Sequence, residues 1–175
     1  MNDVLEVIDK RRSVRAYKDI PVDDEQLKIL IDAALKAPSA RNSQPCHFCF
    51  VRNKKLLKEF ADDFAALDIE KYKDYNVLYA APLTCFIFIE KPGTFSQADL
   101  GIACENIVLA AQSIGLSSVI LGMPKAVFDG NNGAKWYEKL NAPDKSEFLL
   151  AVSIGYAACE KAAHTIRDGL VSVID

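Results

Sequence analysis

Three arginines and one serine lie close together near the start of the chain, in the segment Arg11-Arg12-Ser13-Val14-Arg15. If this segment is extended, the side chains of Arg11, Ser13 and Arg15 point to one side, because side chains alternate along an extended backbone. Two guanidinium groups and a hydroxyl on one side suit a phosphate, since arginine donates paired, charge-assisted hydrogen bonds. The same residues could instead form a solvated helix end, where cations face the last carbonyl groups.

The rest of the chain is slightly acidic, so this cluster is not part of a general basic surface. The chain has 175 residues, a net charge of -3 and 50% apolar residues. This length predicts one domain, residues 1–175, with a full hydrophobic core. The acidic balance argues against a nucleic-acid partner, although a nucleic-acid contact of the arginine segment remains a third hypothesis.

The apolar segments and the cysteines indicate the cellular compartment of the protein. No apolar run reaches 18 residues, and the first residues carry acids, so we expect neither a membrane partner nor a signal peptide. The five cysteines are an odd number in mostly apolar settings, which predicts reduced thiols in a cytoplasmic protein. Cys46 and Cys49 form a C-x-x-C pattern that could indicate zinc or a redox dithiol. The strand predicted there would place the two thiols on opposite faces, which argues against both.

The sequence lacks the usual motifs of side-chain catalysis. It has no glycine-rich phosphate loop, no H-E-x-x-H and no nucleophile elbow. His47 and His164 are therefore interpreted as structural, and no metal site is expected. We expect no catalytic side chain at all, because polar binding groups without such a group indicate a cofactor that carries the chemistry.

Hydrophobic periodicity predicts helices that alternate with buried strands. The clearest helix spans 23–37, where Asp23 and Gln26 resemble a capping box and Pro38 ends the helix. The helix at 100–114, ended by Gly115, is apolar around most of its circumference. Such a helix is either central and part of a subunit interface at once, or central in a monomer. The other predicted elements are helices at 3–10, 54–67 and 69–80 and strands at 47–52, 84–89, 118–121 and 148–154.

Several parts of the chain together resemble the FMN-dependent nitroreductase family, in particular a small single-domain member. The spacings between these parts also fit, and the resemblance covers nearly the whole chain. The matching stretches are Arg11-Arg12-Ser13-Val14-Arg15-Ala16-Tyr17, Pro38-Ser39-Ala40-Arg41-Asn42-Ser43-Gln44-Pro45-Cys46-His47-Phe48, Glu105-Asn106, Gly115-Leu116 and Leu121-Gly122.

The resemblance implies a fold and an assembly. The fold class is α+β, with a central, mostly antiparallel sheet flanked by helices and an extended C-terminal arm over 156–175. The assembly is a domain-sharing homodimer with FMN in two sites at the subunit interface. In the arm, apolar residues would be unstable unless they dock on another surface.

The resemblance also implies the roles of the arginines. Arg11 and Ser13, in a signature that includes Arg12, would hold the FMN phosphate together with Arg167 from the arm. The phosphate would then compensate guanidinium groups that could not be buried together otherwise. Arg15 would lie near N1 and O2 of the isoalloxazine, where a cation stabilises the anionic reduced flavin.

Further contacts to the flavin ring are implied by the same resemblance. The backbone N–H of Gly122 or Met123 would face N5, where hydride enters and leaves. Lys73 and Asn76 fall where the family often has another polar pair on the flavin. The residues implied to reach the flavin of the other subunit are Pro38, Ser39, Ala40 and Asn42, with Gln44 beside them.

The chain departs from the family pattern at two places. Cys46 stands where the family commonly has tryptophan in a Q-P-W-H-F pattern, so an aromatic ring is lost from the core or the interface. The region 90–99 is short, and segments that cover the flavin in longer relatives are missing there.

The function implied is that of an FMN-dependent NAD(P)H oxidoreductase. It would pass hydride from NAD(P)H through flavin N5 to nitroaromatic, quinone or similar acceptors in a ping-pong cycle. The alternative is a flavin-binding store or sensor without NAD(P)H-driven turnover.

Overall fold

The computed structural model describes residues 2–67, 69–72, 75–90 and 92–174, and its centre is one antiparallel sheet. The spatial order of the strands is β1-β2-β4-β3, and each neighbouring pair is antiparallel. All four predicted strands are present, within one or two residues of the predicted bounds. They are β1 (Cys46–Val51), β2 (Leu83–Ile89), β3 (Ser117–Leu121) and β4 (Glu147–Gly155).

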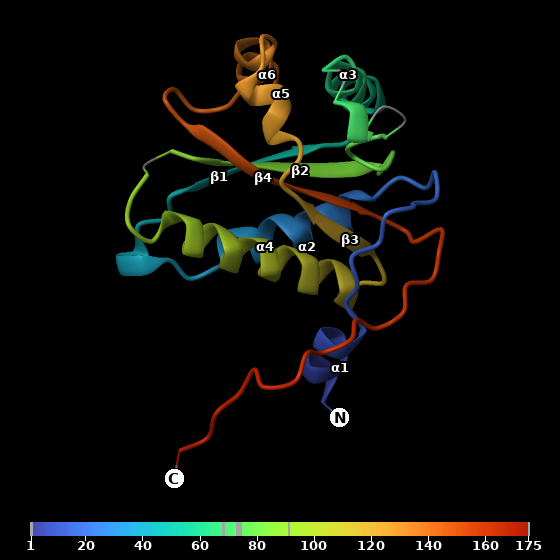
Figure 1. Ribbon diagram of the computed structural model, residues 1–175, viewed down its shortest axis with the longest axis vertical. Helices are drawn as coiled ribbons and strands as arrows, with labels where there is room; N and C mark the ends of the chain where they lie inside the picture. The colour runs from blue at the N-terminus through green and yellow to red at the C-terminus, as the bar shows by residue number, and fades with distance from the viewer. Residues whose placement is uncertain (1, 68, 73–74, 91, 175) are drawn as a thin grey trace.

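Helices cover both faces of this sheet (Figure 1). One face carries α2 (Asp24–Leu35) and the long helix α4 (Ser96–Ser113), and α1 (Asp3–Lys10) packs against α4 from outside. The opposite face carries α3 (Lys54–Ala65), α5 (Lys125–Asp129) and α6 (Gly133–Lys139). The predicted α+β architecture, an antiparallel sheet flanked by helices, is confirmed.

Side chains along β2 point alternately into two parts of the core. Every residue of β2 is buried. Phe86 and Phe88 join an aromatic cluster on the α3, α5 and α6 face, whereas Cys85 and Ile87 join an aliphatic cluster on the α2 and α4 face. Burial of one such large apolar side chain contributes about 1.5–3 kcal/mol. The continuous apolar run therefore serves both layers, as expected of a strand covered on both sides.

The predicted helix ends are present. Asp23 and Gln26 form both bonds of a capping box at the start of α2. After α4, Gly115 adopts a φ of 77°, and the Leu116 N–H donates to the Ala111 carbonyl at 2.9 Å. Glycine favours this left-handed position, which closes the helix.

Three parts of the fold differ from the sequence prediction. The predicted helix at 69–80 is wrong where the structure describes it: only Glu70–Tyr72 form a short 3-10 helix, and turns follow. Tyr79 and Ala80 have φ values of 56° and 51°, which no helix accepts. Helix α4 begins at Ser96, four residues earlier than predicted. Helices α5 and α6 were not predicted, because five and seven residues are too short to show a period.

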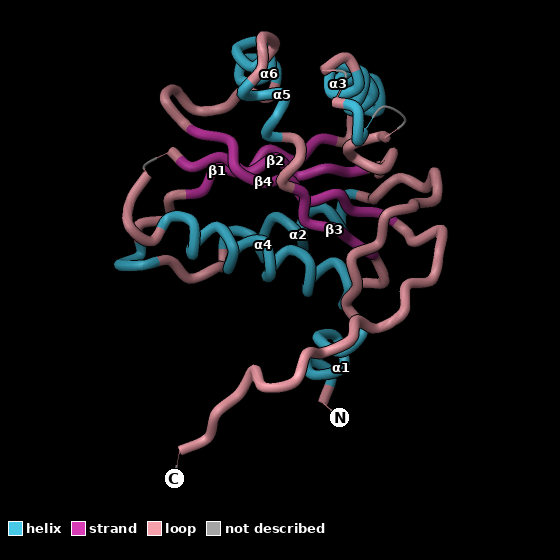
Figure 2. The backbone as a smooth tube through the Cα atoms, viewed as in Figure 1, coloured by secondary structure: helices cyan, strands magenta, loops and turns pink. Residues whose placement is uncertain are grey.

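The two ends of the chain lie outside the layered body. Figure 2 shows residues 11–23 and the last residues as loop, with the C-terminus leading away from the sheet. Residues 158–174 are exposed and have no regular secondary structure. In α1 no residue is buried, and its apolar Val4, Leu5 and Ile8 are more than half exposed. Within the described ranges, no helix has the length and apolar character needed to cross a bilayer.

Candidate functional site

The arginine segment lies against the start of β3. The Val14 N–H donates to the Ser118 carbonyl at 3.0 Å, and Ser13 pairs with Ser118 as an isolated parallel bridge. Val14 is buried, whereas Arg15 is exposed, so the backbone alternates as predicted. The Tyr17 hydroxyl fixes the end of the segment, because its single hydrogen is shared between the Val14 and Ser153 carbonyl oxygens at 2.8 and 3.1 Å. Burial raises the pKa of Tyr17 well above its ordinary value, so this donor keeps its proton.

Arg12 differs from its neighbours. Its guanidinium donates to the carbonyls of Asp9 and Arg11, at the C-terminal end of α1. The helix-end reading of the sequence therefore describes Arg12 well. Among the described residues, the guanidinium groups of Arg11 and Arg15 make no such bond to the carbonyl groups at the end of α1.

Arg11 and Arg15 have little compensation within the chain. The Arg11 guanidinium lies 3.7 Å from the Glu105 carboxylate, and Arg15 donates to the Ser13 carbonyl at 3.3 Å. Among the described residues, Arg11, Arg12 and Arg15 have no other carboxylate within 4.0 Å. Two under-compensated guanidinium groups beside a serine are a donor set that fits a phosphate group.

The second predicted part of the site is the loop between α2 and β1. It contains a short 3-10 helix, η1 (Ala40–Asn42), and its Arg41, Asn42 and Gln44 have φ values of 56°, 53° and 45°. The Gln44 N–H donates to Ser39 Oγ, and the Gln44 side chain donates to Asn42 Oδ1, both at 2.9 Å. Arg41 to Gln44 are exposed, so the loop presents polar groups outward.

One subunit does not bring these two parts together. The Ala40 N–H bonds to Asp99 in the first turn of α4, whereas Ser13 pairs with Ser118, beyond the other end of α4. With a rise of 1.5 Å per residue, the ends of this helix are roughly 25 Å apart. Figure 1 shows the loop before β1 and the N-terminal segment at the two ends of α4. Within one chain, the Ala40 loop and the Ser13 bridge therefore lie toward opposite ends of α4, with the Arg11 guanidinium between them beside Glu105.

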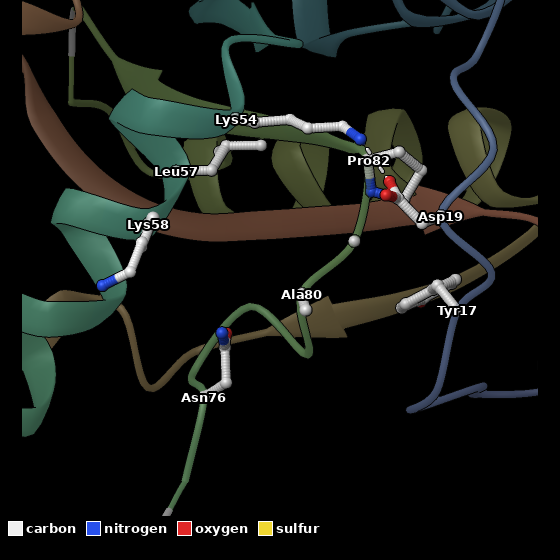
Figure 3. A pocket seen from close by; sticks show the side chains of 9 residues that line it. Tyr17, Asp19, Lys54, Leu57, Lys58, Asn76, Ala80 and Pro82 are labelled. Atoms are coloured by element: carbon white, nitrogen blue, oxygen red, sulfur yellow. Dashed lines mark hydrogen bonds and ion pairs between the residues drawn. The ribbon is translucent and has the colours of Figure 1, made fainter.

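Tyr17 also lines a cavity of about 340 Å³ (Figure 3). It is lined by the segment after the arginines, the start of α3 and the turns before β2, including the predicted site residue Asn76. Asn76 Oδ1 accepts the Leu78 N–H at 2.9 Å, which holds the turn. Lys54 and Asp19 form an ion pair at its edge. Lys73, the other residue predicted with Asn76, lies outside the described residues.

Gly122 and Met123 follow β3 directly. A Cβ added at Gly122 would find only the Leu150 side chain, at 3.9 Å, and its φ is an ordinary one. Gly122 is exposed, and Met123 packs partly against the aromatic cluster. The space above Gly122 leaves room for a ligand, although the chain itself does not require glycine there.

Arg167 lies in the exposed C-terminal residues. Apolar side chains surround it in the sequence and are also exposed. They are Ile166, Leu170, Val171, Val173 and Ile174.

Two acidic residues near the site were not predicted to make contacts there: Asp99 was not singled out, and Glu105 was named only within a stretch that matches the family. Asp99 is 5% exposed and holds Ala40, and Glu105 faces Arg11. An acid in the first turn of a helix is visible in the sequence as a favourable helix start. Its partner lies 59 positions away and carries no sequence signal.

The cysteines give no support to metal or dithiol chemistry. Cys46 packs against the aliphatic cluster and Cys49 against the aromatic cluster, so they lie on opposite faces as predicted. All five cysteines are free. Burial, and next the charge of Asp99, raise the pKa of Cys46 to about 11. Across the described ranges, no group of three or more histidine, cysteine or acidic side chains could hold a metal.

The arginine segment offers donors that fit an anionic ligand, and comparison with known proteins gives the class of the protein. Residues 8–156 match the model of the nitroreductase family. The chain belongs to the nitroreductase family and is an oxidoreductase of the NAD(P)H nitroreductase and FMN reductase type.

Individual relatives extend this likeness over the whole chain. A protein of Archaeoglobus fulgidus assigned as an NADH dehydrogenase/NAD(P)H nitroreductase is 33% identical over 96% of this chain and 93% of its own length. The FMN-bound nitroreductase of Bacteroides fragilis aligns over 100% of both chains, with a TM-score of 0.91 and 26% identity. An FMN-bound nitroreductase of Desulfitobacterium hafniense gives 0.89 and 28%, also over 100% of both chains. The chain spans only 66% of the Vibrio harveyi NADPH-flavin oxidoreductase, which is a longer relative.

Proposed function

We propose that this protein is an FMN-dependent NAD(P)H oxidoreductase that works as a homodimer. The observation that carries the proposal is the segment with Arg11, Ser13 and Arg15. Among the described residues, Arg11 has one half-exposed carboxylate at 3.7 Å, and Arg15 has only a backbone carbonyl. Full-length structural neighbours with bound FMN support the identity of the anion. Names of relatives that include NAD(P)H support the electron donor.

The chain's own groups would bind and orient the cofactor. Arg11, Ser13 and Arg167 would hold the phosphate, and the cation of Arg15 would lie near N1 and O2 of the ring. When bound, FMN supplies hydride acceptance and donation at N5. The backbone N–H of Gly122 or Met123 would face that atom, with Lys73 and Asn76 at the ring's polar edge. The loop of the other subunit would supply Pro38, Ser39, Ala40, Asn42 and Gln44.

The position of the two site parts supports the homodimer. The Ala40 loop and the Ser13 bridge lie toward opposite ends of α4, and a second copy would place its loop over an arginine segment. Exposed apolar residues of α1 and of the arm, such as Leu5 and Val171, support the same assembly, because exposed apolar patches mark contact surfaces. The whole chain would act as one domain.

We infer that the arm docks on the partner subunit. Strand β1 is at the edge of the sheet, and next to it lies an apolar groove of about 460 Å³. Its walls include Ile31 and Leu35 of α2 and Phe48 and Phe50 of β1. An apolar arm and an apolar groove beside a free edge are complementary, since an extended segment can add to such an edge.

The acceptors would be nitroaromatics, quinones or similar compounds reduced in a ping-pong cycle, and the free thiols support a reducing compartment, the cytoplasm. The purified protein should be yellow. Its flavin absorbance should bleach under NADH or NADPH and return on addition of an acceptor. A colourless protein that takes up no FMN would contradict the proposal. A flavin store or sensor would instead remain yellow and show no saturable reduction in stopped-flow measurements.

A further inference from the structure

The loop from Ser39 to Gln44 has a backbone that its own sequence does not favour. Arg41, Asn42 and Gln44 all have left-handed φ values, between 45° and 56°. Asparagine tolerates this conformation, but arginine and glutamine adopt it rarely, and such strain often accompanies a functional site. Internal bonds join the Asn42 N–H to the Ser39 carbonyl at 3.0 Å and the Ser43 N–H to the Ala40 carbonyl at 3.1 Å.

Among the described residues, one hydrogen bond ties this loop to the body of the protein. The Ala40 N–H donates to Asp99 Oδ1 at 2.9 Å. Within the described part of the chain, residues 39–44 make no other hydrogen bond to residues outside the loop. Between its covalent ends at Pro38 and Pro45, the loop is therefore positioned through the acceptor that Asp99 provides.

Packing leaves room on two sides of the loop. A hollow of about 110 Å³ lies on the side of Pro38 and Ser39, and one of about 210 Å³ lies on the side of Arg41 and Ser43. Asp99 lines both hollows. Since side-chain packing is incomplete there, the hydrogen bond carries more of the positioning.

Asp99 itself is well placed for this task. It is 5% exposed and lies in the first turn of α4, where the helix dipole stabilises a negative charge. A carboxylate accepts a backbone N–H more strongly than a neutral oxygen does. Because α4 packs on all four strands of the sheet, the acceptor is fixed to the rigid part of the fold.

We propose that Asp99 is a positioning residue that holds the loop Ser39–Gln44 in the conformation in which it meets the flavin of the partner subunit. The proposal rests on the proposed function, because it assigns the loop a flavin to meet. Asp99 acts through the Ala40 amide and does not itself contact the cofactor.

The test replaces the acceptor and follows both the loop and the cofactor. Asp99→Ala should raise the dissociation constant of FMN at least ~10-fold, which corresponds to about 1.4 kcal/mol. The visible circular dichroism of the bound flavin should change. In the protein without FMN, the Ala40 amide should exchange its hydrogen faster. Asp99→Asn keeps an oxygen at the acceptor position, although a weaker acceptor than the carboxylate, so its FMN dissociation constant should stay within ~3-fold of the wild-type value.

A second variant removes the donor and leaves the carboxylate intact. Ala40 is the first residue of η1, where proline is tolerated, and Ser39 has φ −135° and ψ 153°, which suits a residue before proline. Ala40→Pro should therefore also raise the FMN dissociation constant at least ~10-fold. The double variant Asp99→Ala/Ala40→Pro should be no weaker than either single variant, since both delete the same bond. Asp144→Ala, at an exposed aspartate between α6 and β4, is the matched control and should change nothing.

The outcomes separate the two proposals. If the wild type takes up no FMN, the proposed function fails and this inference fails with it. If the wild type binds FMN and folded Asp99→Ala binds it equally well, only the positioning role is overturned. If Asp99→Ala does not fold, Ala40→Pro and Asp99→Asn decide. Unchanged FMN affinity in Ala40→Pro contradicts the positioning role of Asp99. A loss of FMN affinity in Asp99→Asn while the Ala40 amide stays protected from exchange contradicts it too.

Discussion

The guanidinium group of Arg11 lies 3.7 Å from the carboxylate of Glu105, which is long for an ion pair. The Glu105 side chain is about half exposed, so water weakens the attraction. A phosphate that approached Arg11 would meet this carboxylate as a competing negative charge. The same arrangement therefore partly compensates the charge of the cation cluster and also opposes an anionic ligand.

We expect Glu105→Gln to tighten FMN binding about two- to fivefold at low salt, because it removes the opposing charge near Arg11. Titration of the apoprotein with FMN, followed by flavin fluorescence at low and high salt, measures the effect. The gain should shrink as salt rises. Weaker FMN binding in this variant would show that Glu105 supports the ligand.

Arg167→Ala should weaken FMN retention at least ~10-fold, since a charge-assisted bond to phosphate is lost. Because Arg167 is exposed, the melting temperature of the apoprotein should hardly move. The variant should gain less thermal stability from added FMN than the wild type does. Equal melting shifts with FMN in both proteins would exclude Arg167 from the site.

Gly122→Ala separates a ligand effect from a folding effect. Its φ is ordinary, and the new methyl group would meet only the Leu150 side chain at 3.9 Å, so stability should change by less than about 1 kcal/mol. Turnover with NAD(P)H should fall about tenfold or more, because the methyl group would push the flavin away from the backbone N–H. Denaturant unfolding and steady-state kinetics test the two parts. A variant with lost stability and unchanged turnover would place the flavin elsewhere.

The cysteines should differ sharply in reactivity. Burial raises the pKa of Cys46 to about 11 and that of Cys104 to about 12 from an ordinary 9.0, and Cys85 is fully buried, whereas Cys159 is exposed. At pH 8, iodoacetamide should therefore modify Cys159 first, because the thiolate is the reactive form. Mass spectrometry of peptides reads the result.

The same pKa shifts predict a loss of stability at alkaline pH. A thiol whose pKa is higher in the folded state than in the unfolded state makes its full contribution to the free energy of unfolding below pH 9. This contribution is lost as the pH rises through 11 to 12, since the unfolded chain ionises first. Urea unfolding at pH 8 and pH 10.5 should show lower stability at the higher pH, and the difference should shrink in Cys46→Ala/Cys104→Ala.

Val171 and Ile174 are 81% and 95% exposed in the single chain. If the arm were free, Val171→Asp/Ile174→Asp would do no harm. We expect this double variant to weaken the dimer about tenfold or more, because a docked arm would bury both charges. Sedimentation over a range of concentrations measures the change, and Lys161→Asp serves as a control for added charge alone. An unchanged dimer, or a monomeric wild type, would rule out the docked arm.

Much of the fold could be predicted from local patterns. The continuous apolar run in β2, the capping box at Asp23 and Gln26 and the glycine at 115 each carry their own physical reason, and each is present. Helix α4 was expected to be central, and it contacts every strand. These features depend on residues close together in the sequence, which is why the sequence reveals them.

What the sequence did not reveal depends on distant contacts. The left-handed backbone at Arg41 and Asn42 has no glycine to indicate it, and its support comes from Asp99 on another helix. Tyrosine-rich residues near 75–80 suggested a helix, but they form turns around Asn76. The roles of the individual site residues stay predictions, because they depend on a cofactor and a second subunit.

In the proposed homodimer, the separation of the two site parts along α4 would make cofactor binding depend on the protein concentration. In an assembly of this kind, each flavin is held by two polypeptides. Dilution that separates the subunits therefore also removes the contacts that one of them makes to the cofactor. Flavin release and subunit dissociation then become coupled equilibria, and each stabilises the other by mass action. Specific activity would fall at nanomolar dilution and recover when flavin is supplied in excess.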